Sequence, residues 1–479
     1  MRFYGDSPQH DLTYSDVFLV PSRSDVTSRL DVDLAPGDGT GATIPIVASN
    51  MNSVTGPRLA ATLARRGGLG VLPQDMHPQE LAESIRWVKQ QPTAYDSPIV
   101  MSPDETAADA LTHIPATAGV GVVLHDAAGE YAGTVLASRL ATVPADARLG
   151  DLVHGAATSL EAEDVPDGRA AFDLLDAAGI DFAPVLANGR VIGTLSKTSA
   201  LRSTIYPPAV DGEGRLRIAA AIGINGDVVG RARALRDAGV DVLVLDTAHG
   251  DQEGMRRALG AVSGLDLGLP LVAGNVVTAS AVEDLVAEGA NILKVGVGPG
   301  AMCTTRMMTA VGRPQFSAVL ETAEAARELG ASVWADGGVR YPRDVALALA
   351  AGAASVMIGS WFAGTIESPG LLRTDASGKL YKESWGMAST KAVQARFERL
   401  SAYDRARKEL FAEGISSSKI YLDPMRPSVE DLLDMITTGL RSSFTYAGAR
   451  SVADFHDRAL VGLQSAAGYE EGKALPVSW

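Results

Sequence analysis

Residues 234–250 read ALRDAGVDVLVLDTAHG, an alanine-rich helical segment followed by a glycine, an apolar run and a polar turn. Gly239 is a typical C-terminal cap of a helix, and the valine and leucine run after it is typical of a strand buried on both faces. Similar units recur at 286–295, 326–336 and 350–359. Serial units of helix and strand predict a parallel sheet in an α/β fold.

Polar or glycine-rich residues follow nearly every predicted strand. Six such strand ends are Asn50–Asn52, Asp246–Gly250, Gly274–Thr278, Gly296–Arg306, Asp336–Gly338 and Gly359–Ser360. A closed (β/α)8 TIM barrel brings all of its strand ends to one face, whereas an open doubly wound sheet uses the crevice at one point of its strand order. The barrel is therefore favoured, with residues 1–95 and 207–479 as its two parts.

Residues 96–206 interrupt this repeat and predict an inserted domain. The segment holds two weakly similar halves, each with a helix-like stretch, a strand and a Gly-Thr pair. The pairs are Gly133-Thr134 and Gly193-Thr194, and we expect them in turns whose amides are free to meet a phosphate. Two small α+β modules in tandem explain the pattern.

The composition restricts the class of protein. With 479 residues, of which 46% are hydrophobic, the chain can bury a large core. One cysteine excludes a disulfide framework, and no apolar segment resembles a signal peptide or a membrane span, so we expect a cytoplasmic protein without a membrane partner. The net charge of -15 speaks against nucleic acid as partner but permits a phosphorylated small molecule.

The single cysteine, Cys303, lies in a glycine-rich loop directly after the predicted strand 291–295. A lone cysteine in a cytosolic chain is commonly a small buried apolar residue. Here the flanking glycines allow a ligand to approach the backbone, and Thr304 and Thr305 place hydroxyls beside the thiol. The pattern therefore favours a nucleophile.

Several motifs together resemble the inosine monophosphate dehydrogenase and guanosine monophosphate reductase superfamily. They are Leu12–Val17, Asn50–Val54, Gly274–Thr278, Gly298–Arg306, Asp336–Val339, Gly359–Ser360, Gly386–Met387 and Glu413–Gly414. The resemblance covers nearly the whole chain, and it makes the insert similar to the family's tandem CBS modules, which usually bind adenine or guanine nucleotides.

The resemblance also implies roles for individual residues. Cys303 would be the nucleophile that bonds to purine C2, with Thr305 and Glu413 moving protons. The substrate would be held by Ser53, Asp336, Gly337, Gly338, Gly359, Ser360, Gly386, Met387 and Glu413. The cofactor would contact Asp246, Thr247, Ala248, Asn275, Gly296 and Gly298, and the carbonyls of Gly298, Gly300 and Cys303 would bind a monovalent cation such as K+.

Within this family the flap distinguishes two reactions. Dehydrogenases hydrolyse the intermediate with an Arg-Tyr pair, which the matching stretch 388–405 does not contain. Ser49–Met51 and Ser443–Ala449 also resemble reductases, whereas the CBS insert is typical of dehydrogenases. We favour a reductase that converts GMP to IMP and ammonia with NADPH, over a dehydrogenase that oxidises IMP with NAD and over a catalytically silent nucleotide sensor.

The same resemblance implies ATP or GTP as effectors at the CBS domain and a homotetramer or octamer as the assembly. One departure bears on the effectors, because Ser199 stands where an aspartate of the CBS motif commonly binds ribose.

Overall fold

Eight parallel strands form a closed barrel in the computed structural model, which describes the chain except for residues 5–8, 154–158, 386–400, 411–416 and 474–479. Around the barrel the order is β11 (Ala219–Ile222), β12 (Val242–Asp246), β13 (Leu271–Val276), β14 (Ile292–Val295), β15 (Ser332–Asp336), β16 (Ser355–Ile358), β3 (Ile46–Ala48) and β4 (Leu69–Leu72). β4 pairs with β11 and closes the ring. The predicted TIM barrel is confirmed.

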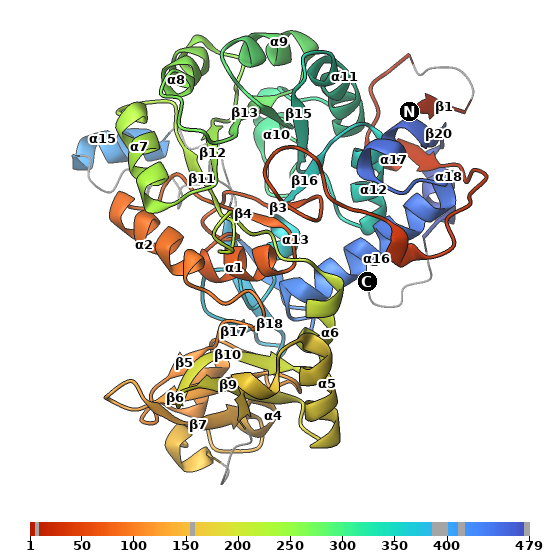
Figure 1. The fold of residues 1–479 in the computed structure, drawn as a ribbon. Coiled ribbons are helices and arrows are strands. Elements are labelled where there is room, and N and C mark those ends of the chain that lie inside the picture. The colour runs from red at the N-terminus through yellow and green to blue at the C-terminus, as the bar shows by residue number, and fades with distance from the viewer. Residues whose placement is uncertain (5–8, 154–158, 386–400, 411–416, 474–479) are drawn as a thin grey trace.

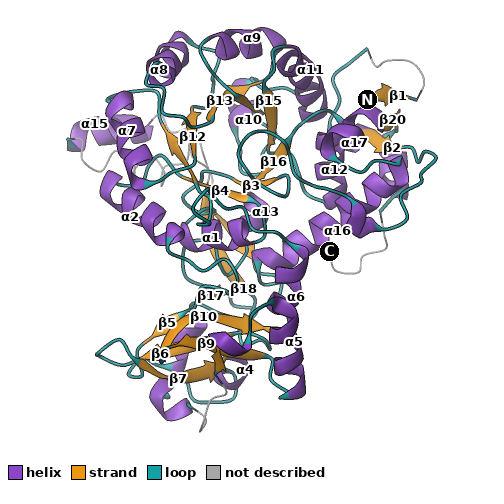
Figure 2. Cartoon of the chain, in the orientation of Figure 1, coloured by secondary structure: helices purple, strands orange, loops and turns teal. Residues whose placement is uncertain are grey.

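Helices surround the barrel on its outside (Figures 1 and 2). They are α1 (Pro57–Arg65), α2 (Pro78–Lys89), α7 (Val228–Ala238), α8 (Glu253–Ser263), α9 (Ala279–Ala287), α11 (Gln315–Glu328) and α12 (Pro342–Ala350). α7 shows why the predicted unit folds as it does: Asp227 accepts a hydrogen bond from the Gly230 amide at the N-terminus, and Gly239 ends the helix at a φ of 97°. The chain can then turn directly into β12.

The amino end of the barrel is closed by the loop before β3. Trp334 lies inside the barrel, and its Nε1 donates to Asp38 Oδ2 over 2.8 Å. The hydroxyls of Ser355 and Thr40 donate to the same carboxylate over 3.2 and 2.6 Å. Because Asp38 is only 8% exposed, this polar cluster is a fixed floor of the barrel.

Further elements pack beside and above the barrel. β20 (Leu460–Leu463) joins β1 (Arg2–Phe3) and β2 (Val17–Leu19) in a small sheet, with α17 (Val452–Arg458) and α18 (Ala466–Glu471) beside it in Figure 1. A second small sheet holds β17 (Arg373–Thr374), β18 (Leu380–Trp385) and β19 (Ser417–Tyr421). Helices α10 (Thr305–Thr309), α13 (Ser360–Ala363), α15 (Ala402–Leu410) and α16 (Val429–Ala447) complete this part.

The interrupting segment folds into two similar halves, seen below the barrel in Figure 1. The first has β5 (Val100–Met101), α3 (Ala107–Leu111), β6 (Gly121–His125), β7 (Tyr131–Leu136) and α4 (Ala137–Leu140). The second has β8 (Leu160–Glu161), α5 (Gly168–Ala177), β9 (Phe182–Ala187), β10 (Arg190–Ser196) and α6 (Lys197–Ile205). In each half one parallel and one antiparallel pairing makes a three-stranded sheet over its own small core.

The two Gly-Thr pairs are not in turns, which corrects the expectation from sequence. Gly133-Thr134 lies inside β7 and Gly193-Thr194 inside β10. The Thr194 amide donates to the Asp96 carbonyl over 2.9 Å. Since this amide already has a partner, it is not free to receive a phosphate.

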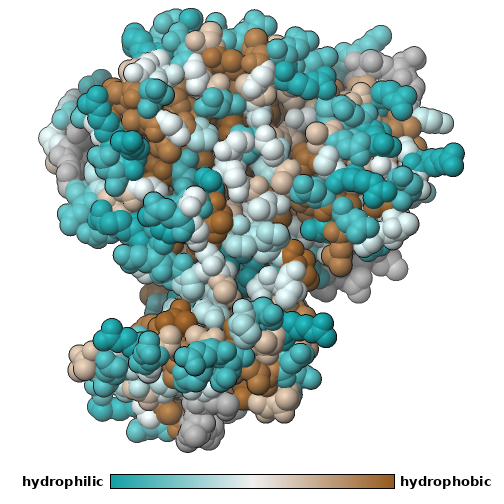
Figure 3. Space-filling view, viewed as in Figure 1, coloured by the Kyte–Doolittle hydropathy of each residue, from teal (hydrophilic) through white to brown (hydrophobic). Residues whose placement is uncertain are grey.

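Hydrophilic side chains predominate over both parts of the face shown in Figure 3, with apolar patches between them. Among the described residues no helix combines the length and the apolar character needed to span a membrane.

Candidate active site

The Cys303 loop connects β14 to the short helix α10 at the carboxyl end of the barrel strands. Gly296 and Gly298 have φ values of 149° and 81°, which side-chain-bearing residues rarely adopt. The Cys303 amide donates to the Gly300 carbonyl over 3.0 Å and closes a tight turn. The glycines therefore shape the loop that presents the thiol.

The thiol of Cys303 is exposed, which rules out the alternative of a small buried core cysteine. Its Sγ donates to Thr305 Oγ1 over 3.2 Å, so the structure brings together two of the three residues to which the sequence assigned chemistry. A thiol in contact with a hydroxyl at a strand's carboxyl end is able to attack an electrophile and exchange protons with a neighbour.

Asp336 ends β15 beside this loop and is held by two donors. Lys294 Nζ lies 2.8 Å and Asn275 Nδ2 3.0 Å from its Oδ2. In the described part of the chain both side-chain hydrogen bonds end on that one oxygen, so Oδ1 keeps its lone pairs for a ligand. The carboxylate is thus fixed in place and still able to accept hydroxyl groups.

Lys294 is the site residue that the sequence analysis missed. It is 3% exposed, and Asp246 Oδ1 lies 2.7 Å from the same Nζ that reaches Asp336. Burial acts to lower the pKa of Lys294, but the two carboxylates outweigh burial and raise it above its ordinary value. The one available signal was a charged residue in the otherwise apolar strand 292–295.

The glycines that follow β15 and β16 lie close to the Cys303 loop and to the end of β3. Gly337 and Gly338 have φ values of 87° and 82°, and a Cβ on Gly337 would lie 3.3 Å from the Gly300 nitrogen. Gly359 precedes Ser360, the first residue of α13, and a Cβ on Gly359 would lie 3.2 Å from Ser49 Oγ. Backbone without side chains thus lines the space between these strand ends.

Ser53 and Ser384 connect the β3 end to the small sheet. Their hydroxyl oxygens lie 3.0 Å apart and both residues are buried. Ser384 belongs to β18, whose last residue, Trp385, directly precedes Gly386. Gly386, Met387 and Glu413, together with most of the stretch 388–405, lie outside the described residues.

The ends of β12 and β13 meet on the other side of the site. The Thr247 amide donates to the Gly274 carbonyl over 3.0 Å, and the Asn275 amide donates to the Thr247 carbonyl over 2.9 Å. Asp246 and Ala248 flank Thr247, and Asn275 Nδ2 also donates to the Gly296 carbonyl over 2.6 Å. Asn275 Oδ1 is buried and has no partner among the described residues. An unpaired buried acceptor of this kind fits a ligand that brings a donor.

No group of three or more His, Cys, Asp or Glu side chains suited to a metal ion occurs in the described part of the chain. The carbonyls of Gly298, Gly300 and Cys303, which the family resemblance implies for K+, lie in the Cys303 loop.

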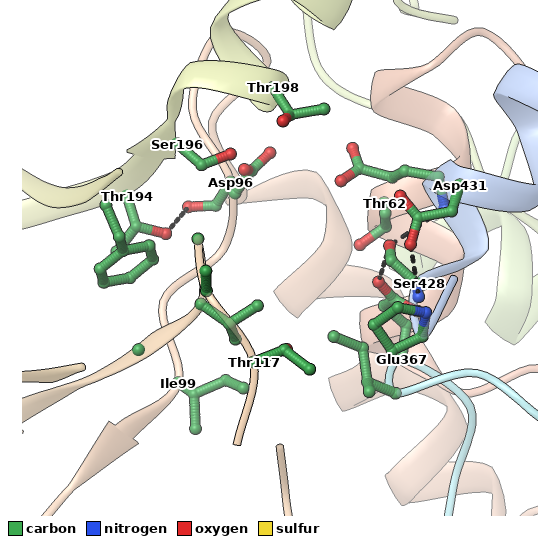
Figure 4. Close-up of a pocket in the computed structure, with 18 of the residues that line it drawn as sticks. Thr62, Asp96, Ile99, Thr117, Thr194, Ser196, Thr198, Glu367, Ser428 and Asp431 are labelled. Atoms are coloured by element: carbon green, nitrogen blue, oxygen red, sulfur yellow. Dashed lines mark hydrogen bonds between the residues drawn. The ribbon is translucent and has the colours of Figure 1, made fainter. Parts of the chain in front are cut away.

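A separate cavity of about 270 Å³ lies where the segment 96–206 meets the barrel. Figure 4 shows Thr194, Ser196 and Thr198 on one side and Thr62, Glu367, Ser428 and Asp431 on the other, with Asp96, Ile99 and Thr117 between. Thr117 Oγ1 is buried and has no partner among the described residues. The cavity is therefore shared between the two parts of the chain and retains an open polar position.

Buried charges hold the walls of this cavity together. Arg66 donates to Glu430 Oε1 over 2.6 Å and to Asp96 Oδ1 over 3.0 Å. Arg202 of α6 reaches three carboxylates of α16, those of Glu430, Asp431 and Asp434, over 3.4, 2.6 and 2.7 Å. Burial and the nearby Glu430 raise the pKa of Asp96, whereas for Glu430 the arginines outweigh burial and lower the pKa.

Fold and site together define a closed α/β barrel with an exposed cysteine at the carboxyl ends of its strands. The sequence pattern of the "IMP dehydrogenase / GMP reductase domain" matches residues 11–474. The chain is 55% identical over its full length to GMP reductases of Mycobacterium tuberculosis and Mycobacterium bovis, and all of each relative is covered. It is 33% identical to an inosine-5'-monophosphate dehydrogenase of Nitrosopumilus maritimus, over 96% of this chain and 97% of that one.

Among solved structures, a GMP reductase variant from Trypanosoma brucei in complex with guanosine 5'-monophosphate matches with a TM-score of 0.69. The identity is 30%, and the match covers 98% of this chain and 99% of the other. The chain belongs to the IMP dehydrogenase and GMP reductase family, as the motifs predicted.

Proposed function

We propose that this chain is a GMP reductase, which converts GMP and NADPH to IMP, ammonia and NADP+. The exposed Cys303 thiol in hydrogen-bond contact with Thr305 supports the covalent chemistry, and the observation that favours the reductase over the dehydrogenase is the missing Arg-Tyr pair in residues 388–405. The mycobacterial relatives, 55% identical over the whole chain, carry the name of the same activity. The dehydrogenase relatives are more distant, at 33 to 34% identity.

Cys303 supplies the covalent step. Its thiolate attacks C2 of the guanine ring, so that an Sγ–C2 bond forms while the C2–N2 bond breaks and the amino group leaves as ammonia. The Sγ–C2 bond breaks again when C2 is reduced, which returns the thiolate and frees IMP. Thr305 Oγ1, 3.2 Å from Sγ, takes the thiol proton at the start and passes it toward the leaving nitrogen.

Glu413 completes the proton path in this proposal, as the acid that protonates the departing amino group. The ribose monophosphate is assigned to the strand ends of β15 and β16. Asp336 accepts the ribose hydroxyls through its open Oδ1, and the backbone at Gly337, Gly338, Gly359 and Ser360 meets the phosphate. Ser53, whose hydroxyl contacts Ser384, is assigned to the substrate as well, and Gly386 and Met387 are assigned to the base.

NADPH is the proposed cofactor, and when bound it supplies the hydride that replaces the amino group at C2. Asn275 fits a nicotinamide, because its buried, unpaired Oδ1 can accept a hydrogen bond from the carboxamide NH2. Asp246, Thr247 and Ala248 on one side, with Gly296 and Gly298 on the other, border the same position. K+ on the carbonyls of Gly298, Gly300 and Cys303 is part of the proposal.

Residues 96–206 are proposed as a tandem CBS domain that regulates the barrel, with ATP or GTP as effectors. The two repeated sheets and the cavity shared with the barrel support this assignment. A homotetramer or octamer is the proposed assembly. The reaction needs Cys303 as a reduced thiol, which fits the reducing cytoplasm as its location.

One pair of assays tests the function. Purified protein is expected to oxidise NADPH only when GMP is added and to release equal amounts of IMP and ammonia. With IMP and NAD it is expected to form XMP slowly or not at all, because residues 388–405 lack the Arg-Tyr pair. Rapid XMP formation without GMP-dependent NADPH oxidation would identify a dehydrogenase instead.

A further inference from the structure

Lys294 connects two carboxylates that the proposed reaction uses for different ligands. Its Nζ lies 2.7 Å from Asp246 Oδ1 and 2.8 Å from Asp336 Oδ2, and its side chain is 4% exposed. Asp246 ends β12 on the proposed cofactor side, and Asp336 ends β15 on the proposed substrate side. One buried ammonium group therefore touches both halves of the site.

Asn275 reinforces this connection. Its Nδ2 donates to the same oxygen of Asp336 over 3.0 Å, and its unpaired Oδ1 is the acceptor proposed for the cofactor. Its main chain is hydrogen-bonded to Thr247, the residue after Asp246. Asp336 is thus linked to the cofactor side twice, by the charged ammonium group of Lys294 and by the neutral amide of Asn275.

We propose, resting on the function proposed above, that Lys294 is a positioning residue that couples the binding of GMP to the binding of the cofactor. An ammonium group is a compact charge with three donors on a flexible stem, so it can redistribute its hydrogen bonds between two acceptors. In a buried site such charge contacts are stronger than they are in water.

The sign of the coupling follows from the shared donor. Ribose hydroxyls that donate hydrogen bonds to Asp336 share this carboxylate with Lys294. The contact between Lys294 Nζ and Asp336 then weakens. The ammonium then binds Asp246 more firmly and orders it for the cofactor. Each ligand thereby orders a carboxylate that the other ligand needs, so binding is positively cooperative and the effect is equal in both directions.

The test uses calorimetry in the Cys303→Ala background, where both ligands bind without turnover. The dissociation constant of NADPH is measured with and without saturating GMP, and that of GMP with and without NADPH. We expect each ligand to lower the dissociation constant of the other by about fivefold or more, and by the same coupling factor in both directions. In Lys294→Met the factor falls to about one, and Lys294→Arg, which keeps the charge, retains part of it.

Lys89 provides a matched control within the same chain. Its buried Nζ lies 2.9 Å from Asp211 and 2.7 Å from Asp241, and its side chain is 6% exposed. Asp241 directly precedes β12, so this bridge sits at the opposite end of the strand from Asp246. Lys89→Met is expected to lower the melting temperature about as much as Lys294→Met, and to leave the coupling factor unchanged.

If Lys294→Met does not fold, Asp246→Asn removes the same bridge and keeps the pairing of Lys294 with Asp336. It is expected to lose the coupling as well. The proposal is overturned if the Cys303→Ala protein binds both ligands without coupling, if Lys294→Met keeps the full factor, or if the Lys89 control lowers the factor equally. Failure of the proposed function is recognised separately, because GMP then does not bind or does not trigger NADPH oxidation.

Discussion

Cys303 is the residue that decides whether the proposed chemistry occurs. We expect Cys303→Ala to reduce GMP-dependent NADPH oxidation at least about 1,000-fold, since no other thiol is present to form the Sγ–C2 bond. Because the side chain is exposed, folding is expected to be unaffected, and GMP affinity measured by calorimetry is expected to stay within about twofold. Turnover near that of the unmodified protein would contradict a covalent mechanism.

Thr305 is tested by a variant that removes its hydroxyl. Thr305→Ala is expected to slow ammonia release about 100-fold, because the thiol loses its hydrogen-bond partner and the proton its first acceptor. Thr309→Ala is the control in the same short helix, since its hydroxyl donates only to the Thr305 carbonyl among the described residues. Stopped-flow measurement of ammonia release separates this step from hydride transfer, and equal slowing by both variants would assign the effect to the helix.

Residues of this site can be predicted from the sequence when they lie close together in one motif. Cys303, Thr305 and the glycines form one motif, so their neighbourhood could be predicted before the structure was known. Lys294 was missed because its partners are distant in the chain and meet it only when β12, β14 and β15 pair in the barrel. A single lysine in an apolar strand does not reveal which carboxylates neutralise it.

The floor of the barrel depends on an element that the strand pattern does not predict, the loop carrying Asp38. Asp38→Ala is expected to lower the free energy of unfolding by about 2 to 4 kcal/mol, because Trp334 Nε1 and the Ser355 and Thr40 hydroxyls lose a buried charged acceptor. Urea unfolding measures the change. Asp33→Ala, on an exposed residue of the same segment, is the control and is expected to change stability by less than about 0.5 kcal/mol.

The N-terminus of α16 is anchored by a buried carboxylate with an unusual titration. Glu367 accepts from Ser428 Oγ over 2.5 Å and from the Val429 amide over 2.9 Å, and burial raises the pKa of Glu367 from 4.5 to about 7. A raised carboxyl pKa means that the folded state binds the proton more tightly. Glu367 therefore lowers stability progressively as the pH rises from about 4.5 to about 7, and no further above that.

Glu367→Gln removes this titration. Relative to the unmodified protein, the variant is expected to gain up to about 3 kcal/mol between pH 4.5 and pH 7, from the shift of the pKa. Urea unfolding across this range measures the difference. Glu213→Gln, the same substitution at a side chain that is 72% exposed, is the surface control. A constant difference for Glu367→Gln would contradict the assigned titration.

At the level of elements, the repeated order of helix, glycine and strand predicted the secondary structure correctly, whereas the two-residue Gly-Thr motif did not. The units ending in β12, β14, β15 and β16 were predicted because helix, glycine and apolar strand follow one another in a fixed order. The Gly-Thr pairs were assigned to turns because glycine favours turns, but in β7 and β10 the glycines allow close packing. A Cβ on Gly133 would lie 2.7 Å from the Val153 side chain, which explains why glycine stands inside a strand.

For the whole molecule, the break in the barrel repeat indicated that the chain has two parts, but not how they meet. The junction is built from charges on α1, α6 and α16, which are far apart in sequence, so no local pattern reveals it. Arg202 of α6 pairs with three carboxylates of α16, and Arg202 lines the shared cavity together with two of them, Glu430 and Asp431. Contacts of this kind are where occupancy of one part is able to influence the other.

Arg202→Ala tests this influence on the proposed regulation. Removing the guanidinium leaves the carboxylates of Glu430, Asp431 and Asp434 close together with less compensation, so the contact between α6 and α16 is expected to loosen. The active-site loops are separate from this contact, and kcat with GMP and NADPH is expected to stay within about twofold. Any change in rate caused by ATP or GTP is expected to fall at least about fivefold.

Arg148→Ala is the matched control for this experiment, because Arg148 pairs with Asp104 inside the segment 96–206 and is 66% exposed. It is expected to keep the full response to ATP and GTP. Limited proteolysis provides a second measurement, in which Arg202→Ala separates the segment 96–206 from the barrel faster than Arg148→Ala does, since a loosened junction exposes the connecting chain. An unchanged nucleotide response in Arg202→Ala together with faster proteolysis would show that the charged junction holds the two parts together without transmitting regulation.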